Sequence, residues 1–365
     1  MVISIDSDQQ AVTLLLEEIV RLCQAHGLEW HSQLRIEVRQ GGMRLLAPRG
    51  AQGTLITLPT QLLVPLEGAR WSAAPDRLEL LEAPAEASDL QRQLLQLHGA
   101  LYNATGKLPW WSQQHPARLV DHHPTVATAL AAVKPHYGES RKATTPAEGF
   151  LATRSFNWKP DSDNSEGQAV LLPLIDLLNH HHRGAPFKVA NGAMTMMVAQ
   201  PDDTEECFAH YGHRRDPLDL ALHYGHLDTS TPFAHGAPLE ISLEGLGWVR
   251  VESQVKRRPA HPLDPPQVTL EGDGLRLSHL CCHHHHPQRV QTVLKLALQG
   301  SLKRRGHPDG EVQRLAEEAI GHLSSANHRM LHRLVEAVDA AGGPGSWILA
   351  EAARRQAAII TAVLT

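Results

Sequence analysis

The spacing of apolar residues predicts helices near both ends of the chain and short strands between them. Apolar residues recur at helical intervals over 11–25, and Gly27 lies just beyond, where a helix can end. Short apolar or alternating runs separated by glycines then predict three strands, at 34–38, 43–47 and 54–58. The pattern is helical again over about 76–133.

The second half of the chain begins with a mixed segment, 149–232, and ends in helices. Residues 253–274 are rich in proline and charge and are expected to form a connector. Beyond them, amphipathic spacing predicts four helices, at 288–302, 311–323, 328–340 and 347–365.

Composition narrows the class of protein. A chain of 365 residues, 42% of them hydrophobic, is long enough for two modest domains. Its formal net charge of −5 argues against a general nucleic-acid binder. The N-terminal residues lack the pattern of a signal peptide, and no apolar run reaches the ~18 residues of a membrane span. Four cysteines do not make a disulfide framework. We therefore expect a reduced cytoplasmic protein with no nucleic-acid or membrane partner, of open oligomeric state.

Histidine is the unusual residue, with 25 copies against four tyrosines. Many histidines occur in clumps, at 122–123, 180–182 and 283–286, and the last clump directly follows Cys281 and Cys282. Thiolate and imidazole ligands suit zinc, copper or nickel. Consecutive side chains point apart, however, and no second ligand pair has the spacing of a structural zinc site. We expect no resident metal, and a metal-handling protein is the most remote of the alternatives.

Several catalytic signatures are absent from the sequence. It has no G-x-x-x-x-G-K-[ST] loop, no G-x-G-x-x-G after a strand, no G-x-S-x-G elbow and no H-E-x-x-H helix. These absences argue against P-loop NTPases, Rossmann dehydrogenases and methyltransferases, common hydrolases and zincin proteases.

Four motifs in the middle of the chain carry the most information about function. They read TRSF from Thr153, LLPLIDLLNHHH from Leu171, TEECFAHYG from Thr204 and DPLDLALHYGHLD from Asp216. In this order they resemble the SET-domain protein methyltransferases, and among them the Rubisco large-subunit methyltransferase-like class. Residues 42–47 and 53–59 resemble, more weakly, the first motif of that class and the strand after it.

The resemblance implies an α+β fold, with a SET β-fold of several short sheets and an α-helical C-terminal domain. It also implies a helical insert at about 76–148 and a pseudoknot-like threading of the chain near Asn179 and Tyr211. The expected order is an N-terminal helix at 1–33, a SET-like catalytic domain at 34–235, a connector at 236–287 and a substrate-binding-like helical domain at 288–365.

The function implied by the resemblance is methyl transfer from S-adenosylmethionine to a side-chain nitrogen of a protein or peptide. Such a transfer needs a bound donor, a neutral nucleophile and their alignment in a dry channel, but no metal. Lysine is the acceptor typical of the family, and desolvation favours its neutral form by lowering the amine's pKa. Histidine is the alternative acceptor, because members of this class also modify it and neutral imidazole dominates at pH 7.

Roles for single residues follow partly from the resemblance and partly from their chemistry. Tyr211 is the expected catalytic residue, whose hydroxyl positions the acceptor nitrogen. Arg154 is expected to pair with the donor carboxylate, and Asp176 would orient His180, four residues on, if that segment were helical. The residues expected to bind the cofactor are Gly42, Met43, Arg44, Arg154, Asp176, Asn179 and His180. Those expected to bind the substrate are His210, Tyr224 and His226.

The sequence departs from the family pattern at several positions. Arg44 stands where the first motif has a glycine, and an arginine lacks a glycine's freedom to adopt positive φ. Asp216-Pro217 replaces a serine-asparagine pair, and His226 stands where a phenylalanine is common. These departures favour either an unusual acceptor or a catalytically silent SET-like binding or scaffold protein, which is the second hypothesis for function.

Overall fold

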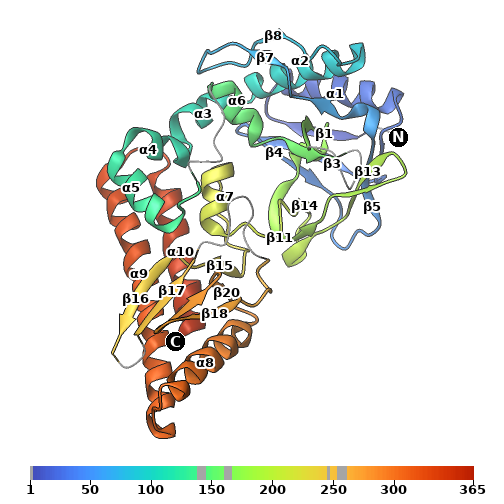
Figure 1. Ribbon diagram of the computed structural model, residues 1–365. Helices are drawn as coiled ribbons and strands as arrows, with labels where there is room; N and C mark the ends of the chain where they lie inside the picture. The colour runs from blue at the N-terminus through green and yellow to red at the C-terminus, as the bar shows by residue number, and fades with distance from the viewer. Residues whose placement is uncertain (1–2, 138–144, 160–166, 245–246, 253–260) are drawn as a thin grey trace. The chain divides into compact units, whose positions relative to one another are not determined.

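The computed structural model describes residues 3–137, 145–159, 167–244, 247–252 and 261–365 (Figure 1). The chain divides into two compact units. Unit 1 comprises Met1–Gln113 and Ala143–Gly212, and unit 2 comprises Gln114–Lys142 and His213–Thr365. Both mix helices with small sheets, so the predicted α+β class is confirmed. In the described part of the chain, no helix is both long and apolar enough to cross a membrane.

Unit 1 is built from short strands and four described helices. The helices are α1 (Gln10–Ala25), α2 (Asp89–Ala104), α3 (Lys107–Gln114) and α6 (Pro146–Ala152). The strands are β1 (Ser4–Ser7), β2 (Glu29–Trp30), β3 (Arg35–Arg39), β4 (Gly42–Leu46), β5 (Thr54–Pro59), β6 (Val64–Pro65), β7 (Arg70–Trp71), β8 (Leu80–Glu82), β9 (Phe156–Trp158), β10 (Gln168–Leu171), β11 (Asn179–Ala185), β12 (Lys188–Ala190), β13 (Ala193–Met197) and β14 (Phe208–Ala209).

Alternation and helical periodicity explain the core of unit 1. In β3, Ile36 and Val38 are fully buried between exposed arginines, as a strand with one face on a core requires. In α1, the buried residues recur at helical spacing and cover one stripe, which packs against β1 and α2. The predicted helix at 11–25 and the three predicted strands are confirmed, each to within a residue or two.

The sheets of unit 1 are small and irregularly connected. Their strand orders are β1-β3-β4, β12-β13-β5-β2, β6-β10-β9, β7-β8 and β11-β14. The last pair is parallel, with Asn179 opposite Phe208 and His180 opposite Ala209. Parallel neighbours need a crossover connection, and here the chain between them forms the hairpin β12–β13, which pairs with β5. This pairing brings two of the sequence motifs to one place (Figure 1).

Unit 2 combines a helical core with two sheets. Its helices are α4 (Pro116–His122), α5 (Pro124–Val133), α7 (Pro217–Tyr224), α8 (Pro287–Arg304), α9 (Asp309–Ala341) and α10 (Ser346–Leu364). Its strands are β15 (Phe233–His235), β16 (Leu239–Leu243), β17 (Gly247–Val251), β18 (Val268–Glu271), β19 (Gly274–Leu277) and β20 (Cys281–His283). The helix α10 packs against α9, α7 and the two strands β15 and β20.

Two features of unit 2 differ from the sequence predictions. The helices predicted at 311–323 and 328–340 are one continuous helix, α9, so the prediction of a break was wrong. The segment predicted as a connector, 236–287, holds the sheet β16-β17-β19-β18 and the strand β20 in its described part. Residues 253–260 of that segment, and 138–144 of the predicted helical insert, lie outside the described residues.

Candidate functional site

The glycine just before the first motif of the SET-like class, residues 42–47, packs against the end of α2. Gly41 has a φ of +73°, and a Cβ added to it would lie 2.3 Å from the carbonyl oxygen of Thr105. Only glycine permits both this backbone conformation and this approach. The position that requires glycine is therefore Gly41. Arg44 lies within the strand β4, where no positive φ occurs. The arginine at position 44 consequently puts no strain on the backbone.

Tyr102, at the end of α2, is the centre of a buried polar cluster. Its side chain is fully buried, and its hydroxyl donates a hydrogen bond to Asp176 Oδ2. The guanidinium carbon of Arg154 lies 5.8 Å from the centre of the Tyr102 ring and 5.6 Å from that of Phe150. Burial and the Asp176 charge raise the pKa of the Tyr102 phenol, so this hydroxyl stays a donor at neutral pH. Tyr102 had no predicted role, because nothing in the local sequence marks its contact with a residue 74 positions away.

Two polar atoms of this cluster are buried and have no hydrogen-bond partner among the described residues: Asp176 Oδ1 and Arg154 Nε. A buried polar group without a partner destabilises a fold by roughly 1–3 kcal/mol, so such groups call for an explanation. One of these atoms accepts hydrogen bonds and is anionic, and the other donates and is cationic. Together they match the ammonium and the carboxylate of an α-amino acid group.

The backbone before Asp176 is strained. Leu174 has φ 64° and ψ −34°, a conformation that bulky residues rarely adopt. The next residues form a 3₁₀ turn, Ile175–Leu177, and β11 begins at Asn179. The segment is not helical, so Asp176 does not lie one helical turn before His180, and the predicted pairing of these two side chains fails. Strain of this kind is concentrated at functional sites in proteins.

Asn179 links residues 42–47 to the motif TEECFAHYG, which begins at Thr204. Its Nδ2 donates to Glu206 Oε1 at 2.7 Å and lies 3.4 Å from the carbonyl oxygen of Met43. Arg44 forms an ion pair with Glu37, and its Nη1 lies 3.7 Å from Glu206 Oε2. The structure thus brings the strand that begins at Gly42 together with Asn179. Glu206 joins them, and although it belongs to a motif read from the sequence, it had no predicted role.

Tyr211 is held through both its backbone and its hydroxyl. Its N–H donates to His180 Nδ1 at 3.1 Å, and its hydroxyl donates to the carbonyl oxygen of Leu178 at 2.5 Å. The rings of His180 and Tyr211 lie 5.2 Å apart. Because the hydroxyl proton is directed at Leu178, the phenolic oxygen presents its lone pairs as acceptors. The structure therefore brings together His180 and Tyr211, two residues of the predicted site.

His210 is also next to this pair. Its ring centre lies 5.5 Å from that of His180 and 5.5 Å from that of His182, and its Nδ1 accepts a hydrogen bond from Gly212 N–H. The imidazoles of residues 180, 182 and 210 thus gather beside Tyr211. His180 and His210 both use Nδ1 as an acceptor, which leaves the proton of the neutral ring on Nε2.

Tyr224 and His226 belong to unit 2. Tyr224 ends α7, and Gly225 after it caps the helix with a φ of 64°, which explains the second tyrosine-glycine pair. The guanidinium of Arg215 lies 5.2 Å from the centre of the Tyr224 ring. The roles of Tyr224 and His226 in substrate binding stay predictions.

The cysteine-histidine run forms a buried strand. Cys281–His283 is β20, which pairs antiparallel with β15. Burial raises the pKa of both the Cys281 and the Cys282 thiol, and a protonated thiol is a poor metal ligand. Within the described ranges, no group of three or more histidine, cysteine, aspartate or glutamate side chains could hold a metal ion.

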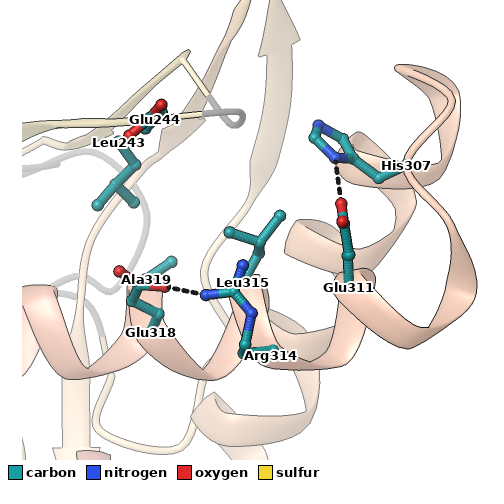
Figure 2. A pocket seen from close by; sticks show the side chains of 8 residues that line it. All are labelled: Leu243, Glu244, His307, Glu311, Arg314, Leu315, Glu318 and Ala319. Carbon is teal, nitrogen blue, oxygen red and sulfur yellow. Dashed lines mark hydrogen bonds and ion pairs between the residues drawn. The ribbon is translucent and has the colours of Figure 1, made fainter.

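Unit 2 also contains a polar cavity of about 410 Å³ between the end of β16 and the helix α9 (Figure 2). His307 and Glu311 face each other at 3.5 Å, and Arg314 and Glu318 at 3.0 Å. None of the residues with a predicted role lines this cavity.

Comparisons with known proteins find similarity among solved structures. No protein-family model matches the chain, and no curated protein matches it. Among solved structures, the chain is similar to Rubisco LSMT bound to AdoMet, with 13% sequence identity and a TM-score of 0.41. The match covers 96% of this chain and 89% of that one.

Proposed function

We propose that the protein transfers a methyl group from S-adenosylmethionine to a side-chain nitrogen of a protein or peptide, with lysine as the acceptor. One observation carries this proposal: the unpartnered, oppositely charged atoms Asp176 Oδ1 and Arg154 Nε lie around the buried Tyr102 ring and its hydroxyl. The order of the SET-like motifs along the chain supports the same conclusion.

The residues of the polar cluster fit the amino-acid end of S-adenosylmethionine. Arg154 would bind its carboxylate by a charge-assisted hydrogen bond, and Asp176 would accept from its ammonium group. Asn179, His180 and the strand from Gly42 to Arg44 would hold the remainder of the molecule. When bound, the cofactor supplies a methyl carbon that is activated by the positive charge on its sulfur.

Tyr211 would position the acceptor nitrogen. Its hydroxyl donates to Leu178, so its oxygen would accept an N–H of the neutral amine and direct the nitrogen lone pair at the methyl carbon. His210, beside Tyr211, would line the same channel. The pseudoknot-like threading near Asn179 and Tyr211 is part of this proposal, and the parallel pairing of β11 with β14 supports it. We also propose that the helical domain at 288–365 presents the substrate.

Binding and transfer are tested in sequence. Titration calorimetry with S-adenosylmethionine should give saturable binding, and the absence of binding at millimolar concentration would overturn the proposal. Mass spectrometry of host-lysate proteins incubated with the protein and a labelled methyl donor should then identify a labelled lysine. Label on histidine would assign the alternative acceptor. Cofactor binding without label on any protein would instead support the catalytically silent binding protein.

A further inference from the structure

Lys107 is half-buried and follows Tyr102 of the polar cluster closely along the chain, and the proposed function does not use it. It is the first residue of α3, directly after Gly106, which turns the chain with a φ of +64°. No hydrogen bond or ion pair engages its ammonium group within the described residues. A lysine in such a place differs from the paired and exposed lysines of the surface, because it is partly removed from water and lacks a compensating anion.

The helix that begins at Lys107 packs against the helix that leads to Arg154. The ring of Trp111, one turn along α3, occupies the space beside Gly149 in α6, where an added Cβ would lie 2.3 Å from the ring. The helix α6 leads directly to Arg154, and α2, whose last turn contains Tyr102, ends at Ala104, shortly before Lys107. Burial and, after it, the charge of Arg154 lower the pKa of Lys107 to about 8.

Two neighbouring cations in a partly buried place repel each other and are stabilised by an anion between them. Asp176, the carboxylate of the polar cluster, has one oxygen engaged by Tyr102. The other charged or titratable groups described in the cluster are Arg154, Tyr102, Tyr211 and Cys23, and burial and the Asp176 charge raise the pKa of the Cys23 thiol. The excess of positive charge at the Lys107 side therefore matches a carboxylate from outside the chain.

We propose that Lys107 acts with Arg154 as a second cation that binds the carboxylate of S-adenosylmethionine, so that cofactor affinity depends on the protonation of Lys107. This inference rests on the proposed function. Because a bound carboxylate favours the charged amine, binding takes up a proton where the lysine of the ligand-free protein is largely neutral, above about pH 8. At pH 7 the lysine is already charged, and binding takes up little.

The test compares S-adenosylmethionine with its decarboxylated analogue, which lacks only the carboxylate. In titration calorimetry at pH 7, Lys107→Ala should weaken the binding of S-adenosylmethionine about 10-fold or more, and it should change the binding of the analogue less than twofold. Lys107→Arg should restore most of the affinity. Lys188→Ala, which removes an exposed lysine of β12 in the same unit, is the matched control and should leave both affinities unchanged.

The pH dependence gives a second readout. Between pH 7 and 9, the affinity of the wild type should fall several-fold more than that of Lys107→Arg, because arginine stays charged. The titration of the cofactor's own amino group is common to both proteins and cancels in this comparison. Equal slopes would overturn the inference, as would equal weakening of both ligands by Lys107→Ala.

The outcomes separate this inference from the proposed function. A wild-type protein that binds neither ligand would overturn the proposed function itself. A wild type that binds S-adenosylmethionine, together with a Lys107→Ala variant of unchanged affinity, would overturn only the role of Lys107. If circular dichroism shows that Lys107→Ala is unfolded, Lys107→Met replaces it, because methionine keeps much of the aliphatic stem. Lys107→Met should then weaken the binding of S-adenosylmethionine about 10-fold or more and that of the decarboxylated analogue less than twofold.

Discussion

The Tyr211 hydroxyl can be removed while the rest of its ring and its backbone hydrogen bond to His180 remain. Tyr211→Phe should therefore lower turnover by about 100-fold, because the acceptor nitrogen loses its positioning contact, and should leave cofactor affinity within about twofold. Steady-state kinetics and calorimetry measure the two effects. Tyr137→Phe is the matched control, since it loses a hydrogen bond of the same kind, from a tyrosine hydroxyl to the Leu222 carbonyl, in unit 2. Wild-type turnover in Tyr211→Phe would exclude the catalytic role.

Asp176 contributes a charge that its amide analogue lacks. Asp176→Asn should weaken the binding of S-adenosylmethionine by roughly 10- to 100-fold, the usual range for a hydrogen bond to a charged group. Asp202→Asn, which changes an exposed carboxylate paired with Arg183, is the control in the same unit. Equal affinities of the two variants would remove Asp176 from the cofactor site.

At the scale of elements, the start of α7 depends on a buried ion cluster. Lys134 Nζ lies 2.7 Å from Asp216 Oδ2 and 3.0 Å from Asp219 Oδ1, and Asp216 is also the N-cap of the helix. Lys134→Met would leave two buried carboxylates without their cation and should lower the free energy of unfolding by about 3–5 kcal/mol. Urea denaturation measures this loss. The exposed Lys295→Met in α8 should lose less than about 0.5 kcal/mol, and a similar value for both would contradict the prediction.

His235 in β15 contacts the same ion cluster, through its N–H to Asp216 Oδ2, and makes the stability of the fold depend on pH. Burial and the charge of Lys134 lower the pKa of His235 from 6.5 to about 4. Between these values the folded chain binds fewer protons than the unfolded chain, so this contribution to stability is lost as the pH falls from 6.5 to 4. His235→Gln should therefore lose less stability than the wild type over this range in urea titrations. Asp216, whose pKa is raised by burial and the Asp219 charge, acts in the opposite sense and is common to both proteins. Parallel curves would refute the assignment.

The helix α9 illustrates why element boundaries were harder to predict than elements. Asn327 lies between the two helices predicted at 311–323 and 328–340, yet it is fully buried in a continuous helix. Its Nδ2 donates to the Leu323 carbonyl, and its Oδ1 accepts from the N–H of Ala237. Periodicity registers only whether a residue is polar. It does not show that Ala237, which lies far from Asn327 in the sequence, supplies the hydrogen-bond partner with which this polar side chain can be buried.

At the scale of the whole molecule, the parts of the site that could be predicted are those within motifs. Asn179, His180, Tyr211 and Met43 were predicted together, and the structure brings them together. Tyr102 and Lys107 were missed, because a helical leucine-rich segment gives no sign of which of its residues will face a loop far along the chain. Asp176 was predicted as a site residue but with the wrong partner, since the prediction assumed a helix where the chain forms a strained turn.

The two units should respond differently to the cofactor. In hydrogen-exchange mass spectrometry, S-adenosylmethionine should slow amide exchange in β11, in β14 and at the junction of α2 and α3, all in unit 1. Peptides around Glu311 and Glu318, at the cavity of Figure 2, should exchange unchanged. Protection confined to the cavity would instead indicate that the ligand binds in unit 2.

The parallel pairing of β11 with β14 also governs when the site can form during folding. The hairpin β12–β13, which pairs with β5, separates the two strands along the chain, so the contacts of His180 with Tyr211 depend on long-range loop closure. We expect a site that depends on such closure to form on the native side of the folding barrier. A bound ligand would then slow unfolding and leave the refolding rate nearly unchanged, so that a cell's supply of cofactor would extend the lifetime of the folded protein without hastening its maturation.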